Sequence, residues 1–114
     1  MNHSESLKKN KDFQQVYRNV TSQANRFLVM YVLKNQCGKN RLGISVSKKV
    51  GNSVVRHRIT RLIRESYRLN ETLFERGLDI VVVARTGAKG RSYQEIESAL
   101  LHLGQRHKCC GGKP

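Results

Sequence analysis

The stretch from Ser45 to Glu65, SVSKKVGNSVVRHRITRLIRE, holds most of the longest helix that the sequence predicts. Asn52 or Ser53 can cap this helix, which runs from about Val54 to about Asn70. One side of the helix has apolar spacing and carries Val55, Ile59, Leu62, Ile63 and Ser66. The opposite side carries Arg56, His57, Arg61, Arg64 and Arg68, with Arg58 at its flank. We therefore expect the apolar side to pack on a sheet and the cationic side to meet an anionic partner.

The charges on this helix are almost all of one sign. Five arginines lie between Arg56 and Arg68, and Glu65 is the one acid in that stretch. A solvated helix face usually alternates lysine with glutamate in i,i+4 pairs, which this segment does not do. Guanidinium groups bind phosphate oxygens bidentately and stack on bases. RNA contact is therefore favoured over a merely solvated face.

The composition of the whole chain points to the same class of partner. The 114 residues include 22 lysines and arginines against 8 aspartates and glutamates, which gives a formal net charge of +14. A polyanion relieves such self-repulsion and releases its own counterions. A membrane surface is an alternative partner, but no apolar run approaches the ~20 residues of a spanning helix, and we expect no signal sequence. A merely soluble basic protein also remains open.

The cysteines predict neither a disulfide framework nor a metal centre. There are three, at positions 37, 109 and 110, which is an odd number without a recognised spacing. We therefore expect a reducing, cytoplasmic environment. A structural zinc site is not favoured at the adjacent pair, because it needs four well-spaced ligands.

Upstream of Ser45–Glu65, the sequence predicts a short helix and two strands. Asn10 can cap the helix, and Asp12 then lies in its first turn, with Phe13, Val16 and Tyr17 on one face. The strands are expected at 26–33 and 41–47, separated by a turn that contains Gly38.

Downstream, one strand and one helix are expected. The run DIVVVA at 79–84 is typical of a strand buried on both faces, and the basic segment RTGAKGR at 85–91 indicates a flexible loop. Ser92 and Glu95 form a capping box for the last helix. The order of elements predicts an α/β (α+β) two-layer sandwich, with helices on a small mixed sheet. We expect a single domain over 1–114, with 1–9 and 108–114 flexible.

Several stretches of the chain together resemble the bacterial ribonuclease P protein family. The segment SVSKKVGNSVVRHRITRLIRE is similar to the family signature, an Arg-Asn-Arg helix preceded by Lys-Lys-x-Gly-Asn. The resemblance extends upstream to LKKNKDFQQVYRN, from Leu7 to Asn19, and downstream through the buried strand to the last helix. Two positions depart from the signature: His57 stands where asparagine is common, and Thr60 where lysine or arginine is usual.

The resemblance implies a function and a division of labour. The chain would be the protein subunit of the endoribonuclease ribonuclease P, binding the catalytic RNA and the 5′ leader of precursor tRNA and assisting endonucleolytic removal of that leader. The RNA subunit would hold the catalytic magnesium and cleave the phosphodiester, so no protein side chain is assigned as catalytic or as a metal ligand. Neither a membrane nor a small-molecule substrate is expected as a partner. The family also implies a left-handed crossover, whereas the general rule for parallel strands predicts a right-handed one.

The resemblance further implies two binding surfaces. The catalytic RNA would dock on Lys48, Lys49, Asn52, Arg56, His57, Arg58, Arg61, Arg64 and Arg68. Phe13, Tyr17 and Tyr31 match the positions that contact the leader in the family. The two-residue period of a strand puts Phe27 and Val29 on the same face as Tyr31, so they either line that groove or simply pack in the core.

Three rival classes explain the sequence less well. A ribosomal or general RNA-binding protein would account for the charge but not for the whole signature. A free-standing nuclease needs a carboxylate cluster, and Asp12, Asp79 and Glu95 are scattered over different elements. A membrane-surface protein would show aromatic residues at the rim of its helix, which the arginine helix lacks.

Overall fold

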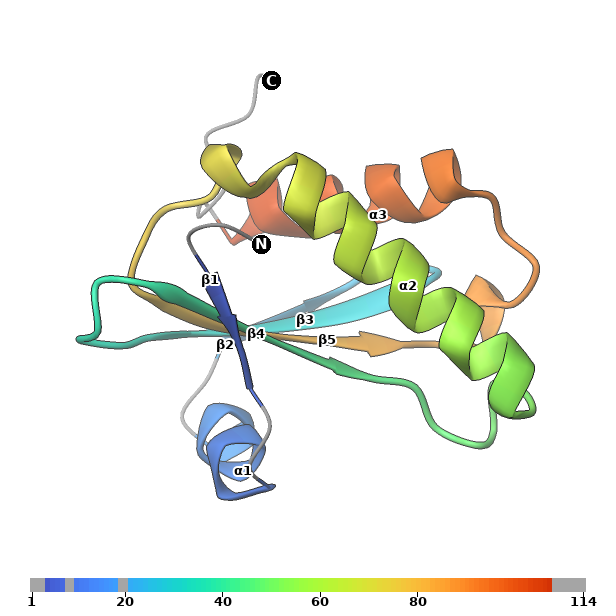
Figure 1. Ribbon diagram of the computed structural model, residues 1–114, viewed down its shortest axis with the longest axis horizontal. Coiled ribbons are helices and arrows are strands. Elements are labelled where there is room, and N and C mark those ends of the chain that lie inside the picture. Colours follow the sequence, from blue (N-terminus) through green and yellow to red (C-terminus); the bar gives the residue numbers. More distant parts are fainter. Residues whose placement is uncertain (1–3, 8–9, 19–20, 108–114) are drawn as a thin grey trace.

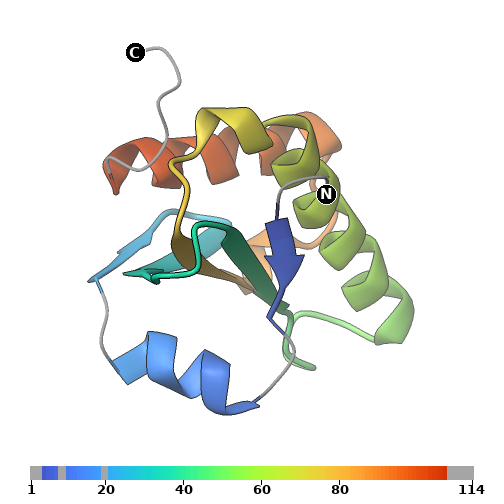
Figure 2. The ribbon, with the colours of Figure 1, turned by 60° about the vertical axis from the view of Figure 1, so that its left-hand side comes forward.

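The fold is a five-stranded mixed sheet with helices on both faces. The computed structural model describes residues 4–7, 10–18 and 21–107, without the side chains of 15–18. Helices α2 (Ser53–Leu69) and α3 (Tyr93–Arg106) cover one face, and α1 (Asn10–Arg18) lies on the other (Figures 1 and 2). The strands are β1 (Ser4–Ser6), β2 (Thr21–Ala24), β3 (Leu28–Lys34), β4 (Asn40–Ser45) and β5 (Leu78–Ala84). The expected α+β class is confirmed, with α1 added on the far face.

The strand predicted to be buried on both faces lies in the centre of the sheet. The strand order is β1-β4-β5-β3-β2, with β5 parallel to β4 and antiparallel to β3. Ile80, Val81 and Val82 of β5 are fully buried. Because α2 and α3 cover one face and α1 the other, an uninterrupted apolar run is what this position requires.

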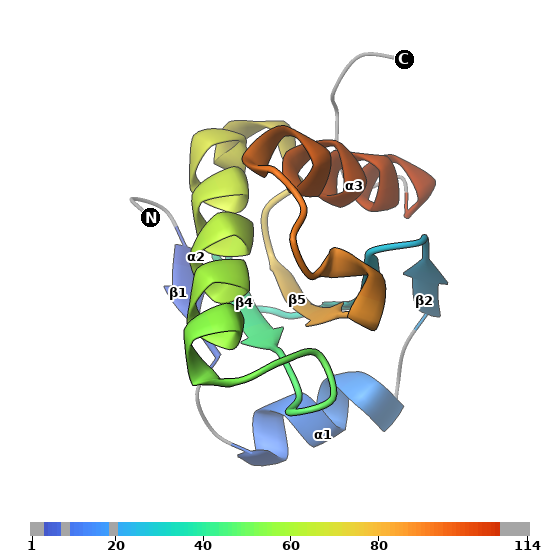
Figure 3. The ribbon, with the colours of Figure 1, turned by 90° about the vertical axis from the view of Figure 1, so that its right-hand side faces the viewer.

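The connection from β4 through α2 to β5 has the left-handed sense that the family resemblance implies. In Figure 3 the parallel strands point toward the viewer and α2 lies above the sheet, and β5 lies to the right of β4. A right-handed crossover would place β5 on the left in this view. The structure therefore departs from the general rule for parallel strands.

Helix α2 packs on the sheet through the side that its periodicity predicts. Ile59, Ile63 and Ser66 are fully buried, whereas Val55 and Leu62 are partly buried against the same core. The Oδ1 atom of Asn52 accepts the N–H of Val55 at 3.0 Å and caps the helix. Tyr67 is also fully buried, although the apolar pattern does not include it.

The capping box predicted for α3 is confirmed in both directions. The Ser92 Oγ accepts the N–H of Glu95 at 3.2 Å, and the Glu95 carboxylate accepts the N–H of Ser92 at 3.0 Å. These two bonds satisfy backbone donors that the first turn of a helix leaves open. The capping box therefore fixes the residue at which α3 begins.

Two expectations about loose segments are wrong. Ser4–Ser6 forms a strand parallel to β4, and the next residue, Leu7, is buried and donates its N–H to the Leu42 carbonyl at 2.8 Å. The basic segment 85–91 is also ordered, because its turn Thr86–Ala88 is hydrogen-bonded and Ala88 is fully buried. The rest of the two ends expected to be flexible, 1–3, 8–9 and 108–114, lies outside the described residues. Strand β2 was not expected at all.

Candidate nucleic-acid interface

The outward side of α2 is a cationic surface. We call the described side chains of Arg56, His57, Arg58, Arg61, Arg64 and Arg68 the arginine face. All of them are exposed except Arg56, which is half-buried. The geometry therefore brings together the helical residues that the sequence predicts for catalytic-RNA binding.

The guanidinium groups of the arginine face differ in what they already bind. Arg56 donates to the Gly51 carbonyl at 3.2 Å, and Arg58 donates to the Arg91 carbonyl at 2.9 Å. Arg68 donates from Nε to the Glu65 carboxylate at 3.0 Å and forms a second, shorter bond to it. Within the described part of the chain, Arg61 and Arg64 form no ion pair or hydrogen bond. Their donors are therefore open to a partner.

One acid moderates this positive surface. The hydrogen bonds from Arg68 hold the pKa of the Glu65 carboxyl below its usual range, and the carboxylate in turn raises the pKa of Arg68. The pair is solvent-exposed, so it contributes little to folding stability. Glu65 neutralises one arginine and leaves the rest of the arginine face positive.

Shallow hollows lie along both edges of α2. The hollow toward α3 is lined by Arg58, Arg61, Leu62, Arg64, Glu65 and Tyr93. The hollow toward β4 is lined by Ile44, Val46, Ser53, Arg56, His57, Thr60 and Arg64. The Thr60 hydroxyl donates to the Arg56 carbonyl at 2.9 Å within the helix, so the departure from the family signature leaves no unsatisfied group. Tyr93 beside the arginines is a feature that sequence periodicity does not reveal.

The turn before α2 presents the two lysines expected to bind RNA. Lys48 and Lys49 are exposed, whereas the next residue, Val50, is buried and anchors the turn. Gly51 is required here, because a Cβ atom at this position would lie 2.7 Å from the Cγ1 atom of Val55. The structure gives Asn52 a capping role, which leaves its amide NH₂ group available for other bonds.

The aromatic residues expected to bind the leader lie on the opposite face of the sheet, where α1 packs. Phe13 and Tyr31 are partly buried against Leu7 and Val81, and the sheet alternation places Val29 on the same face. Tyr17 belongs to α1, but its side chain lies outside the described residues.

Phe27 does not share that face, so the expectation that it lies on the same strand face as Tyr31 is wrong, and the alternative of core packing applies to it. Strand β3 begins at Leu28, and Asn25 forms a turn whose Oδ1 accepts the N–H groups of Phe27 and Leu28. The two-residue period therefore does not reach Phe27. Its ring packs against the core beneath α2 and α3, with the Arg26 and Arg91 guanidinium carbons 5.7 and 4.8 Å from its centroid.

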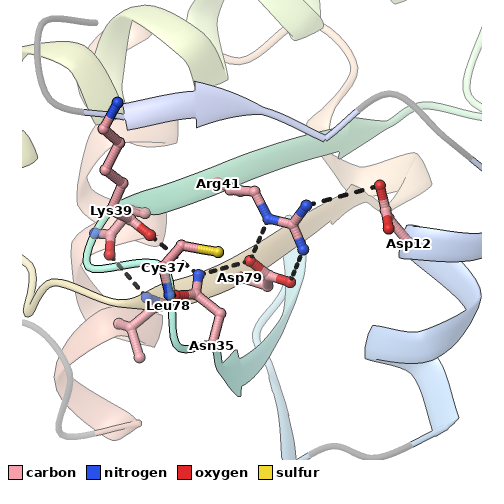
Figure 4. A network of polar contacts seen from close by, with 8 residues as sticks. Asp12, Asn35, Cys37, Lys39, Arg41, Leu78 and Asp79 are labelled. Carbon is pink, nitrogen blue, oxygen red and sulfur yellow. Dashed lines mark hydrogen bonds and ion pairs between the residues drawn. The ribbon is translucent and has the colours of Figure 1, made fainter.

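The described acids do not gather into a metal centre. In residues 4–7, 10–18 and 21–107 there is no group of three or more His, Cys, Asp or Glu side chains that could hold a metal ion. Asp79 is buried and salt-bridged to Arg41, a contact that sequence reasoning missed (Figure 4). That carboxylate raises the pKa of the Arg41 guanidinium above its usual range.

No helix among the described residues has the length and apolarity to cross a membrane.

The comparisons with known proteins agree with this geometry. A family model described as Ribonuclease P matches residues 1–108. The chain belongs to the ribonuclease P protein family. A ribonuclease P protein component of Lachnoclostridium phytofermentans is 67% identical over 105 residues, covering 92% of this chain and 90% of the relative. One from Clostridium botulinum is 54% identical over 98 residues, covering 85% and 88%.

Solved structures of the family have the same fold. The RNase P protein of Staphylococcus aureus superposes with a TM-score of 0.86 at 40% identity, covering 92% of this chain and 96% of that chain. The RNase P protein of Thermotoga maritima gives a TM-score of 0.82 at 30% identity, covering 90% and 96%. The chain is therefore a ribonuclease P protein component of a bacterial tRNA-processing ribonucleoprotein, an endoribonuclease in which the RNA carries catalysis.

Proposed function

We propose that the chain uses its two faces for two RNA ligands. The arginine face, with the turn before it, binds the catalytic RNA, and the sheet face beneath α1 binds the 5′ leader of precursor tRNA. Together they assist removal of the leader to give the mature 5′ end. The observation that carries the proposal is the separation of the two surfaces: arginines with open donors on α2, and half-buried aromatic rings across the sheet.

Charge and geometry support catalytic-RNA docking on α2. Arg61 and Arg64 are exposed on one helical side, three residues apart, where neighbouring phosphates can be bound. The backbone carbonyl bonds of Arg56 and Arg58 orient these side chains and leave further donors for RNA. The proposed surface comprises Lys48, Lys49, Asn52, Arg56, His57, Arg58, Arg61, Arg64 and Arg68.

Half-exposed aromatic rings support leader binding under α1. Single-stranded RNA is bound without sequence preference when bases stack on aromatic side chains and cations follow the backbone. Phe13 and Tyr31 are partly buried against Leu7 and Val81, so each residue is held in place while part of it stays exposed. We call these two residues, with Tyr17 and Val29, the leader groove. Phe27 is left out because it packs on the other face.

The protein contributes positioning and positive charge rather than bond cleavage. The Asp79 carboxylate already accepts bonds from Arg41 and Asn35, so it does not fit a magnesium site. We infer that magnesium, which supplies the Lewis-acid chemistry of hydrolysis, is held mainly by the RNA subunit. Precursor tRNA is the proposed substrate of the assembly, and the cytoplasm its proposed location.

Tyr31→Ala tests the leader groove. In the holoenzyme, we expect this variant to bind precursor tRNA with a leader of several nucleotides less tightly, while binding of mature tRNA is unchanged. Loss of one stacked base corresponds to about 1–3 kcal/mol, or roughly 5- to 150-fold in affinity. The measurement is the dissociation constant for each ligand.

Leu33→Ala is the matched control, because Leu33 is in the same strand and the same apolar cluster but offers no aromatic ring. We expect it to leave the preference for a long leader intact. Equal losses for both ligands in Tyr31→Ala would show that Tyr31 supports the fold and does not contact the leader.

A further inference from the structure

A polar network joins distant segments of the chain around one buried carboxylate (Figure 4). Asp79 lies in the otherwise apolar strand β5 and is only 4% exposed. Its direct partner in the parallel register is Arg41 of β4, which donates from Nε to Oδ1 at 2.8 Å and from Nη2 to Oδ2 at 2.6 Å. Asn35, at the start of the β3–β4 loop, donates from Nδ2 to Oδ1 at 2.8 Å. These bonds satisfy a charge whose burial would otherwise be costly.

The same guanidinium reaches the first turn of α1. Its remaining nitrogen, Nη1, lies 3.8 Å from Oδ2 of Asp12. Both side chains are largely screened from water, with 27% of Arg41 and 19% of Asp12 exposed. Among the described side chains, this is the ion pair that joins α1 to the sheet. Because Asp79 fixes the plane of the guanidinium, the donor aimed at α1 is already oriented.

The residue after Asp12 makes the second attachment of α1. A Cβ atom at Gly43 would lie 2.6 Å from Cζ of Phe13, so the ring rests directly on the β4 backbone. Gly43 is two residues beyond Arg41 on the same strand and therefore on the same face. Two adjacent α1 residues are thus held by two same-face residues of β4, beside the cluster that contains Tyr31.

The position of α1 depends on such contacts. The helix has nine residues, and a helix of this length is marginal in water without tertiary packing. One charged attachment and one apolar attachment join it to β4, and the helix also packs on β3 and β5. A change at the charged attachment alone would let the helix shift while the buried Arg41–Asp79 pair stays intact.

We propose that Arg41 is a positioning residue for the 5′ leader: anchored by Asp79, it holds Asp12 and thereby keeps Phe13 in the leader groove next to Tyr31. This inference rests on the leader groove proposed above. Arg41 touches neither the leader nor the scissile bond and acts through α1. Its effect is confined to substrates whose leader is long enough to enter the groove.

Asp12→Asn is the sharpest test, because it removes the charge that faces Arg41 and leaves the pair with Asp79 in place. We expect holoenzyme affinity for a precursor with a leader of several nucleotides to fall about three- to tenfold, less than the loss of a stacking ring. Affinity for a precursor with a single-nucleotide leader, and affinity of the protein for the catalytic RNA, should not change. Asp12→Glu keeps the carboxylate and should restore the long-leader affinity.

Glu5→Gln is the matched control. It breaks the exposed 3.4 Å ion pair between Glu5 of β1 and Lys39, and this pair does not involve α1. It should bind both precursors as the unchanged protein does. Unfolding midpoints of all variants, measured without RNA, show whether any loss of affinity follows from a general loss of stability.

Two results would overturn the inference. Unaltered long-leader affinity in Asp12→Asn would show that α1 is positioned without Arg41. Equal losses for long and single-nucleotide leaders would show that the ion pair has a purely structural role. Tyr31→Ala separates the two proposals. If Tyr31→Ala causes a leader-specific loss of affinity and Asp12→Asn does not, the positioning role of Arg41 alone fails. If Tyr31→Ala causes no leader-specific loss, the leader groove itself is refuted.

Discussion

Replacing Arg61 and Arg64 together by alanine removes the two guanidinium groups of the arginine face that have no ion pair or hydrogen bond within the described residues. Neither side chain supports the fold, because both are exposed on the side of α2 that faces away from the sheet. We therefore expect a folded protein that binds the catalytic RNA more weakly. The loss should come from phosphate contacts and their released counterions.

The size of the effect follows from counterion release. Each phosphate contact contributes about 0.7 to 0.9 to the slope of log affinity against log salt concentration, so two contacts contribute about 1.4 to 1.8. If the affinity extrapolated to 1 M salt is unchanged, binding at 0.1 M salt becomes roughly 25- to 60-fold weaker. Both numbers come from one experiment, in which the dissociation constant for the catalytic RNA is measured at several salt concentrations.

A second double variant, Lys34→Ala with Arg76→Ala, controls for net charge. Both residues are exposed, and they lie at the end of β3 and just before β5, away from the arginine face. The control lowers the net charge by the same amount, so any long-range effect is matched. Phosphate binding by Arg61 and Arg64 is refuted if their double variant keeps the original slope, or if the control reduces the slope equally.

Two further substitutions test the packing that supports the surfaces. Gly43→Ala should push the Phe13 ring off β4 at a stability cost of about 1–3 kcal/mol. Affinity for long leaders should fall several-fold, and affinity for the catalytic RNA should not change. Unchanged affinity for long leaders would contradict the role of the contact between Phe13 and Gly43. Ile63→Ala should lower the free energy of unfolding by about 2–5 kcal/mol, because the side chain is fully buried. Urea denaturation measures this loss, and Leu69→Ala, 55% exposed on the same helix, should change the midpoint little.

The helix pattern was sufficient to predict how α2 packs. The apolar and cationic sides were both assigned correctly because an amphipathic helix repeats its pattern along the chain. The apolar side assigned from the sequence left out Tyr67, whose hydroxyl needs a hydrogen-bonding partner when it is buried. In the structure the hydroxyl accepts a bond from Asn40 at 3.0 Å, which allows the whole side chain to be buried.

The short edge strands could not be predicted from local sequence. Ser4–Ser6 and Thr21–Ala24 are mostly polar and too short for a two-residue period to emerge. They are strands because β4 and β3 offer unpaired edges to them. Their formation therefore depends on contacts between residues far apart in the sequence.

Local sequence patterns located some residues of the candidate surfaces and misplaced others, because some of the positions depend on contacts between distant residues. The arginines of α2 could be located from a single helical repeat, whereas Phe27 was misplaced because a turn at Asn25 interrupts the strand period. The Arg41–Asp79 pair joins residues 38 positions apart, and sequence reasoning did not connect them. One signal was present: an aspartate inside a run of buried apolar residues requires a charged or hydrogen-bonding partner.

Single-turnover cleavage of a precursor tRNA with a leader of several nucleotides, at low magnesium, shows which subunit performs the chemistry and which one assists it. The protein alone, the catalytic RNA alone and the two together are compared. We predict strong cleavage only in the mixture, because the protein supplies docking and leader contacts and the RNA supplies the chemistry. Cleavage by the protein alone would contradict this division of labour, and a mixture no faster than the RNA alone would contradict the assisting role of the protein.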